Sequence, residues 1–225
     1  MAEAQSEGTD GVDPLNGDPR LEPFFGRSWA AVLGFHDLLV SQGELRGLVG
    51  PRELSRLWER HLLNSAAVVP FLPREGRIID LGSGAGLPGI VVAAMLPDAE
   101  VVLLEPMERR TAWLSEVAEQ LGLDNVVVRR GRAQDEHGRL VGTAVTVRAV
   151  ASLDKLYRMA LPLLEAGGSL LALKGSKAED EIEAAKHVGR KLGAGVASVV
   201  DAPTIEGVEV TRVVRVVREA VPGVR

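Results

Sequence analysis

The stretch Ile78-Ile79-Asp80-Leu81-Gly82-Ser83-Gly84-Ala85-Gly86-Leu87-Pro88-Gly89 decides the fold that we predict for this chain. It begins as an apolar strand, passes into three alternating glycines and reaches a proline that suits the first turn of a helix. Glycine is needed where the backbone turns with a positive φ or lies close to a ligand. Because open α/β sheets bind ligands at the carboxyl ends of their strands, this loop is a candidate ligand site.

Short apolar runs alternate with amphipathic stretches after this loop. The alternation predicts an α/β fold with a doubly wound, mostly parallel seven-stranded, Rossmann-like sheet. The expected strands are Arg77–Leu81, Glu100–Glu105, Asn125–Arg129, Thr143–Val150 and Gly168–Lys174, followed by a C-terminal β-hairpin of Val196–Val200 and Val208–Val217. The expected helices are Pro88–Leu96, Met107–Leu121, Leu153–Leu164 and Lys177–Leu192.

The N-terminal third has a different pattern. Residues 1–23 are acidic and poor in large apolar groups, which predicts a disordered tail. Residues 24–72 show apolar side chains at helical spacing and predict a helical lobe. We therefore divide the chain into this tail, this N-terminal helical lobe and a ligand-binding domain over residues 73–219.

Composition excludes several classes of protein. The 225 residues contain no cysteine, which excludes disulfides, thiolate zinc sites and a cysteine nucleophile. No apolar run is long enough to span a membrane and no secretion signal precedes the fold, so we expect a cytoplasmic protein. The net charge is −5, but the acidic tail carries all of it, and the rest of the chain is neutral with local arginine clusters. We expect no metal site, no membrane partner and no DNA partner.

Two cofactors compete for the glycine loop. Glu105 ends the second expected strand, 19 residues after Gly86, where an acid can accept both hydroxyls of a ribose. The loop also matches the nicotinamide fingerprint, which would seat a pyrophosphate on helix amides. Pro88 removes one of those amides, and Asp80 would repel a pyrophosphate but could receive the ammonium of a methionine moiety. S-adenosyl-L-methionine is therefore the favoured cofactor, with Asp80, Gly82, Gly84, Gly86 and Glu105 as its expected ligands.

The adenine of that cofactor should lie over the end of the next strand. There the backbone amide of Ala133 could donate to a ring nitrogen, and the side-chain carbonyl of Gln134 could accept from the exocyclic amine. An ordinary polar loop explains the same spacing equally well.

Further segments extend the pattern beyond the loop. They are Trp58-Glu59-Arg60-His61-Leu62-Leu63-Asn64-Ser65, Arg109-Arg110 with Trp113-Leu114, Arg148-Ala149, and Ala172-Leu173-Lys174-Gly175. Together with the glycine loop, they make the chain resemble the RsmG family, also called glucose-inhibited division protein B. These are class I methyltransferases that act on N7 of a guanine in 16S ribosomal RNA. Asn64, Val147 and Gln134 depart from the residues usual in that family.

The resemblance implies cofactor contacts at Gly82, Leu87, the Ala133-Gln134 pair and Arg148. It also implies a guanine of 16S ribosomal RNA as the target. We expect this RNA to be bound within the small ribosomal subunit and the enzyme to be a monomer. Guanine N7 carries a free lone pair, so its methylation needs positioning and electrostatics rather than a general base or a covalent intermediate. A methyltransferase acting on a small molecule or a protein is the alternative, because the fold alone does not decide.

Two cations are the candidate catalytic residues. Arg148 ends the fourth expected strand and should orient the cofactor or the target nucleotide, with a surface ion pair as the alternative. Lys174 ends the fifth and could neutralise a target phosphate, although a solvated lysine is nearly as good an explanation. An open basic face of Arg109, Arg110, Arg130, Arg132 and Lys174 would favour RNA as the substrate. His61 is interpreted as a packing residue, with a contact to cofactor or RNA as the alternative.

Overall fold

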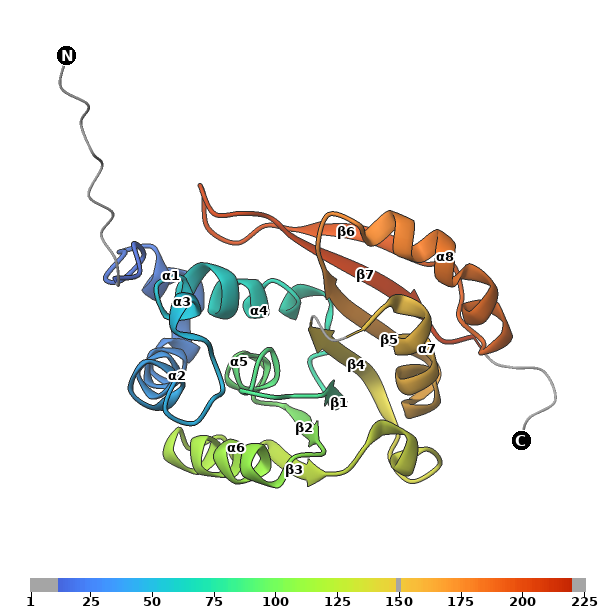
Figure 1. Ribbon diagram of the computed structural model, residues 1–225, viewed down its shortest axis with the longest axis horizontal. Coiled ribbons are helices and arrows are strands. Elements are labelled where there is room, and N and C mark those ends of the chain that lie inside the picture. The colour runs from blue at the N-terminus through green and yellow to red at the C-terminus, as the bar shows by residue number, and fades with distance from the viewer. Residues whose placement is uncertain (1–11, 149–150, 220–225) are drawn as a thin grey trace, which may run out of the picture.

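The computed structural model describes residues 12–148 and 151–219, and it consists of a sheet with helices on both faces (Figure 1). The strands are β1 (Gly76–Leu81), β2 (Ala99–Glu105), β3 (Val126–Arg130), β4 (Gly142–Arg148), β5 (Leu164–Lys174), β6 (Ser198–Ala202) and β7 (Thr211–Val217). The α-helices are α1 (Leu21–Phe25), α2 (Trp29–Gln42), α3 (Pro51–Leu54), α4 (Asn64–Ala66), α5 (Gly89–Met95), α6 (Glu108–Gln120), α7 (Leu153–Ala160) and α8 (Ala178–Lys191). Short turns of other helix types are η1 (Gly26–Ser28), η2 (Trp58–Leu63), η3 (Val69–Phe71), η4 (Ala133–Glu136) and η5 (Leu161–Leu163).

The sheet has the order β3-β2-β1-β4-β5-β7-β6. The first five strands run parallel, and β7 pairs antiparallel with both β5 and β6. The chain reverses direction across the sheet between β1 and β4, the position at which open α/β sheets bind ligands. The predicted seven-stranded, mostly parallel sheet with a C-terminal hairpin is confirmed.

Two apolar cores lie on the two faces of the sheet. In Figure 1, α5, α6 and α2 cover one face, and α7 and α8 cover the other. Ile78 of β1 belongs to the first core and its neighbour Ile79 to the second, because successive strand side chains point to opposite faces. Both are fully buried, which explains why the parallel strands read as continuous apolar runs.

The N-terminal region differs from the prediction in two ways. Residues 12–23, assigned to a disordered tail, form turns and the start of α1, and Leu21 is fully buried. The first eleven residues lie outside the described part. The helices of residues 24–72 share one core with α5 and α6, in which Phe35 packs with Ile90 and Leu114. The predicted helical lobe is therefore packed onto the sheet domain.

Several element ends also shift. The helix predicted to reach Leu164 ends at Ala160 and continues as η5, because Pro162 lacks the amide that an α-helix needs. The last strand begins at Thr211 rather than Val208, since the Glu209 N–H donates to Glu59 Oε1 (3.4 Å) instead of to β6. The fourth strand ends at Arg148, and its last two predicted residues lie outside the described ones.

Candidate active site

The glycine loop joins β1 to α5 at the centre of the sheet. Gly82, Gly84 and Gly86 all have positive φ angles of 73°, 56° and 105°, which glycine alone adopts without strain. A Cβ at Gly82 would meet nothing within 4 Å, and one at Gly84 would meet nothing nearer than 3.8 Å. At Gly86 it would lie 2.7 Å from Ile90 Cγ1. The first two glycines therefore border open space, whereas Gly86 faces the core.

The residues after the loop serve mainly to pack the helix. Leu87 was expected to contact the cofactor, but its side chain is buried in the core beside the N-terminal helices. Pro88 follows it through a cis peptide bond and precedes α5 instead of opening it. A contact between Leu87 and the cofactor stays a prediction.

Asp80 lies at the end of β1 and is almost completely buried. Its Oδ2 accepts a hydrogen bond from the Gly89 N–H (3.1 Å), so the carboxyl group caps the first amide of α5. Its Oδ1 is buried and has no hydrogen-bond partner among the described residues. Burial raises the pKa of Asp80 to about 7, although Ser83, Gly89 and Arg148 act in the opposite direction.

Glu105 ends β2 and faces the same loop. Its Oε2 accepts from the Gly84 N–H (3.0 Å) and its Oε1 from the Met107 N–H (3.0 Å). Arg110 Nη1 lies 3.9 Å from the same carboxylate. The acid expected to bind a ribose is thus held against the glycine loop, at the expected strand end.

A cavity of about 160 Å³ opens beside Glu105 at the ends of the first four strands. Its walls are mostly apolar: Leu81, Gly82, Leu104, Pro106, Gly131, Arg132, Ala133, Gln134, Val147, Leu156 and Met159. The structure places the Ala133-Gln134 pair in this cavity, and its contact with adenine stays a prediction. Leu156 and Met159 were missed, although their spacing on one face of amphipathic α7 could have indicated them.

On the other side of the strand ends, Arg148 meets the helices before β1. Its Nη1 donates to the Arg60 carbonyl oxygen (3.0 Å). Burial lowers the pKa of Arg148 to about 10, while Asp80 and then Glu53 raise it, so the side chain stays protonated at neutral pH. Arg148 is therefore a half-buried cation within the site rather than a surface ion pair.

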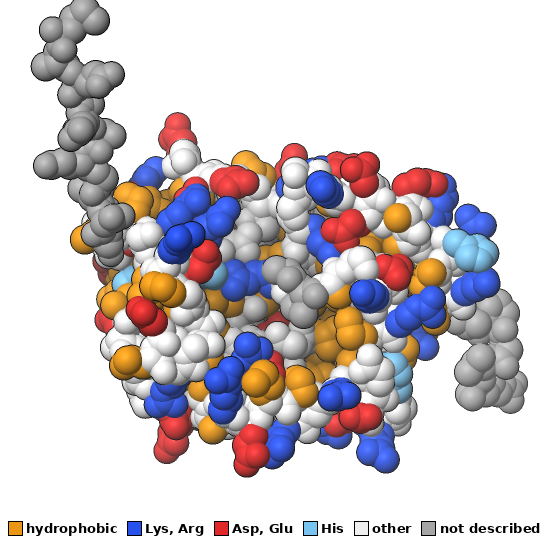
Figure 2. Space-filling model, in the orientation of Figure 1, with side chains coloured by type: hydrophobic (Ala, Val, Ile, Leu, Met, Phe, Trp, Pro, Cys, Tyr) orange, Lys and Arg blue, Asp and Glu red, His pale blue; other side chains and the backbone are white. Residues whose placement is uncertain are grey.

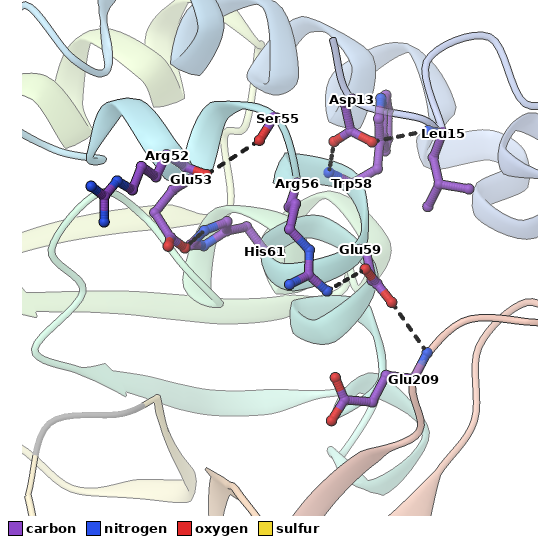
Figure 3. Close-up of polar contacts among 10 residues, drawn as sticks. All are labelled: Asp13, Leu15, Arg52, Glu53, Ser55, Arg56, Trp58, Glu59, His61 and Glu209. Atoms are coloured by element: carbon purple, nitrogen blue, oxygen red, sulfur yellow. Dashed lines mark hydrogen bonds and ion pairs between the residues drawn. The ribbon is translucent and has the colours of Figure 1, made fainter. Parts of the chain in front are cut away.

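His61 binds Glu53 (Figure 3) and is close enough to Arg148 for the charge of that residue to act on it. His61 Nε2 and Glu53 Oε2 are 2.7 Å apart, and His61 Nδ1 is buried without a partner among the described residues. Burial and the nearby charge of Arg148 lower the pKa of His61, so it is neutral at pH 7. His61 is thus a buried packing residue that also lies at the candidate site. No sequence pattern indicated Glu53 as a site residue, because its hydrogen bond to His61 joins α3 to η2, two separate helical segments.

These residues line an open hollow of about 890 Å³. Most of the residues that line it are polar: Glu53, Glu59, Arg60, His61, Asn64, Arg148, Ser152, Lys174, Ser176, Glu181, Glu209, Thr211 and Arg212. Ala151, Leu173, Gly175 and Val210 complete the lining, so its surface is both polar and apolar. Lys174, expected to neutralise a phosphate, is buried and donates to Ala151 O (2.5 Å) and Glu181 Oε2 (2.8 Å). Its charge is already paired, so a contact with a phosphate stays a prediction.

The expected basic face is mixed in sign. Arg110 lies near Glu105, Arg130 pairs with Glu108, and Lys174 pairs with Glu181. Figure 2 shows blue and red side chains interspersed on the face in view. Arg109 and Arg132 are exposed. The charged side chains therefore form no broad positive field on these residues, and contacts between them and RNA stay a prediction.

The residues present fit S-adenosylmethionine. Asp80 Oδ1 is a buried oxygen without a partner, the loop at Gly82 borders open space, and the apolar cavity suits a flat purine. Within residues 12–148 and 151–219, no group of three or more His, Asp or Glu could hold a metal ion. In those same ranges, no helix is long and apolar enough to cross a membrane.

This sheet order, glycine loop and adenine-sized cavity at the strand ends define an S-adenosylmethionine-dependent methyltransferase of class I. Comparison with known proteins then gives the family. Residues 29–205 match the family model described as rRNA small subunit methyltransferase G (GidB), and the chain belongs to that family. The resemblance seen in the sequence motifs is confirmed.

Curated relatives agree with this assignment. Ribosomal RNA small subunit methyltransferase G of Beutenbergia cavernae is 51% identical over 191 residues, covering 85% of this chain and 90% of the relative. The protein of the same name from Thermobifida fusca is 52% identical over 176 residues, covering 78% of this chain and 74% of the relative.

Solved structures share the fold at low identity. The methyltransferase SibL, in its apo form, has a TM-score of 0.59 and 18% identity, covering 79% of this chain and 62% of SibL. TYW2 from M. jannaschii, in complex with AdoMet, has a TM-score of 0.53 and 18% identity, covering 68% of this chain and 72% of TYW2.

The glycines give a test of which loop surface binds the cofactor. Gly82→Ala adds a methyl group in open space at a left-handed φ, so we expect about 1–2 kcal/mol of strain and a cofactor affinity at least tenfold lower. Gly89→Ala would place its Cβ 2.3 Å from Leu103 Cδ2 and 2.5 Å from Asp80 Oδ2. We expect this second change to lower the unfolding free energy by about 1–3 kcal/mol.

Thermal unfolding and calorimetric titration with S-adenosylmethionine measure both effects. Unchanged cofactor affinity in Gly82→Ala would contradict the placement of the cofactor over Gly82. Unchanged stability of Gly89→Ala would contradict the close contact between α5 and Asp80.

Proposed function

We propose that this protein transfers a methyl group from S-adenosylmethionine to N7 of a guanine in 16S ribosomal RNA. The bound cofactor supplies an electrophilic methyl group on a positively charged sulfur. Asp80, Gly82, Gly84 and Glu105 would hold its methionine and ribose parts, and the cavity at Ala133 would hold its adenine. The small ribosomal subunit is the proposed form of the substrate, in the cytoplasm, and the enzyme is proposed to act as a monomer.

One observation carries the proposal. The apolar cavity and the hollow take consecutive residues at the end of β4: Val147 lines the cavity and Arg148 lines the hollow. We infer that a cofactor with its adenine in the cavity extends along the strand ends toward Arg148, where a nucleotide in the hollow would meet its methyl group. The hollow is open and carries many charged side chains rather than being closed and aromatic, which favours a nucleotide presented by a large RNA over a small apolar molecule.

The charges around the hollow suit attack by a ring nitrogen. Guanine N7 needs no proton removed, but the base gains a positive charge as the methyl group arrives. His61 is held neutral by burial and adds no opposing cation, and the carboxylate of Glu53 lies beside it. Arg148 can donate to guanine O6, which is an acceptor next to N7 in the same plane. These residues orient the base and balance charge, without a covalent intermediate.

The test is methyl mapping on ribosomal RNA. Small subunits lacking the modification are incubated with the protein and radiolabelled S-adenosylmethionine, and digested rRNA is analysed by mass spectrometry. We expect one new N7-methylguanine in 16S rRNA, formed faster on subunits than on naked RNA. The Arg148→Ala variant serves as the impaired control. Methylation of another atom would contradict the assignment to N7, and cofactor binding without transfer to any RNA would contradict the proposed function.

A further inference from the structure

The segment Asp13–Asn16 clamps the start of η2 (Figure 3). Asp13 Oδ2 accepts from the Trp58 backbone N–H (2.8 Å), and its Oδ1 accepts from the Leu15 N–H (3.0 Å). Asn16 Oδ1 accepts from the indole Nε1–H of Trp58 (2.9 Å). The segment thus holds Trp58 by both its backbone and its ring, across more than forty residues of sequence. We call residues 13–16 the N-terminal clamp.

Burial makes this contact consequential. Asp13 is only 3% exposed, and Trp58 is 1% exposed. The Trp58 ring also stacks on His36, with ring centroids 4.6 Å apart, and on Trp29, at 5.5 Å. Without the Asp13 carboxylate, a buried amide at the first position of η2 would lose its acceptor, which is a costly state for a helix end.

The turn that begins at Trp58 carries the target side of the active site. Residues Trp58–Leu63 form a π-helical turn, and the Asn64 N–H donates to the Glu59 carbonyl oxygen five residues earlier. Such turns are rare and often occur at functional sites. The Arg60 carbonyl oxygen holds Arg148 (3.0 Å), and His61 binds Glu53 (2.7 Å). The position of this turn therefore sets the position of His61 and of the acceptor that orients the Arg148 guanidinium.

The opposite side of η2 is held separately. Glu59 Oε2 accepts from Arg56 Nη2 (2.8 Å), and Glu59 Oε1 accepts from the Glu209 N–H (3.4 Å) in the β6–β7 loop. Arg20, a few residues after the clamp, reaches the Glu206 carbonyl oxygen in the same loop (2.5 Å). The clamp and the loop thus hold η2 from two sides, and the clamp supplies the hydrogen bonds to the backbone N–H and the indole N–H of its first residue.

We propose that Asp13 is a positioning residue for methyl transfer, acting through Trp58 and η2 on Arg148 and His61. This inference rests on the proposed function for its kinetic consequence. The clamp precedes residue 29, where the match to the family model begins, so the family match does not assign it. A segment whose composition resembles a disordered tail becomes part of the active-site framework.

The test uses full-length Asp13→Ala, Asp13→Asn and a stability control, Asn125→Ala. Asn125 Nδ2 binds the carbonyl oxygens of Ala93, Leu96 and Ala99, far along the chain from η2, so its loss should destabilise the fold without moving the clamp. We expect Asp13→Ala to lower kcat/KM for the small subunit about tenfold, the usual worth of a buried charged hydrogen bond. We expect Asp13→Asn, which keeps an acceptor, to recover most of this rate.

A second measurement, the titration of His61, does not depend on methyltransferase activity. The ring signals of His61 in NMR report its pKa, and in Asp13→Ala we expect this pKa to rise toward the ordinary value as η2 loosens. Unchanged His61 titration and unchanged kcat/KM in Asp13→Ala would overturn the proposal, as would an equal loss of rate in an equally destabilised Asn125→Ala. If the wild type fails to methylate the subunit, the proposed function is contradicted, while the His61 titration still tests the clamp.

Discussion

Arg148→Ala is expected to lower kcat/KM for methyl transfer by about 100-fold or more, the usual effect of removing one preorganised charged donor. Arg148 is the last residue of β4, donates a hydrogen bond to the Arg60 carbonyl oxygen, and interacts electrostatically with Asp80 and Glu53. The substitution removes the positive charge that interacts with the Asp80 and Glu53 carboxylates. It also removes the hydrogen-bond donor proposed for guanine O6. Most of the loss should appear in kcat, because the same site would orient cofactor and base together.

Two matched variants sharpen this test. Arg148→Lys keeps the charge but loses the planar guanidinium that spans both the Arg60 carbonyl and a base, so we expect only partial recovery. Arg139→Ala removes an exposed arginine in the loop before β4 and should leave the rate unchanged. Full activity and unchanged cofactor affinity in Arg148→Ala would show that this arginine has no role in the reaction.

The parts of the site that the sequence predicted are those that follow from strand ends. Glu105 and Arg148 are the last residues of their strands and Asp80 is the penultimate residue of β1. Because parallel strands bring their carboxyl ends to one edge, order along the chain was enough to group them. The Ala133-Gln134 pair follows the same rule after β3. The apolar runs likewise predicted the sheet, because both of its faces are buried.

The parts that the sequence did not predict depend on contacts between distant segments. Asp13 looks like one of several acids in a polar tail, and only its hydrogen bond to Trp58 distinguishes it. In the sequence, Glu53 is an ordinary acid in the first turn of a short helix, and only its hydrogen bond to His61 places it at the site. Lys174 ends a strand as Arg148 does, yet Glu181 of α8 neutralises it. Local periodicity carries no signal for any of these three pairings.

Asp80→Asn is expected to stabilise the cofactor-free protein at pH 8 and to weaken S-adenosylmethionine binding. The pKa of Asp80 is about 7 in the folded protein and 3.8 in its ordinary state, because burial disfavours the charge. A raised carboxyl pKa means that the folded state binds more protons between pH 4 and pH 7. Stability is therefore fully present below pH 4 and is lost as the pH rises through 7. The full loss is at most about 4 kcal/mol, at ~1.36 kcal/mol for each pH unit.

Asparagine removes the cost of burying a charged carboxylate but can still accept a hydrogen bond from the Gly89 N–H. The free energy of unfolding of the variant should therefore exceed that of the wild type by roughly 2 kcal/mol or more at pH 8, and by much less at pH 4. Its cofactor affinity should fall about tenfold, since a buried ionised carboxylate is the group suited to a cationic methionine moiety.

Asp124→Asn, at an exposed position before β3, is the control for both measurements. Urea unfolding at several pH values and calorimetric titration measure the two effects. A buried charge kept for cofactor binding predicts that Asp80→Asn raises the free energy of unfolding at pH 8 and lowers the affinity for S-adenosylmethionine. If the variant were instead less stable at pH 8 and bound the cofactor as tightly as the wild type, Asp80 would be only a helix cap.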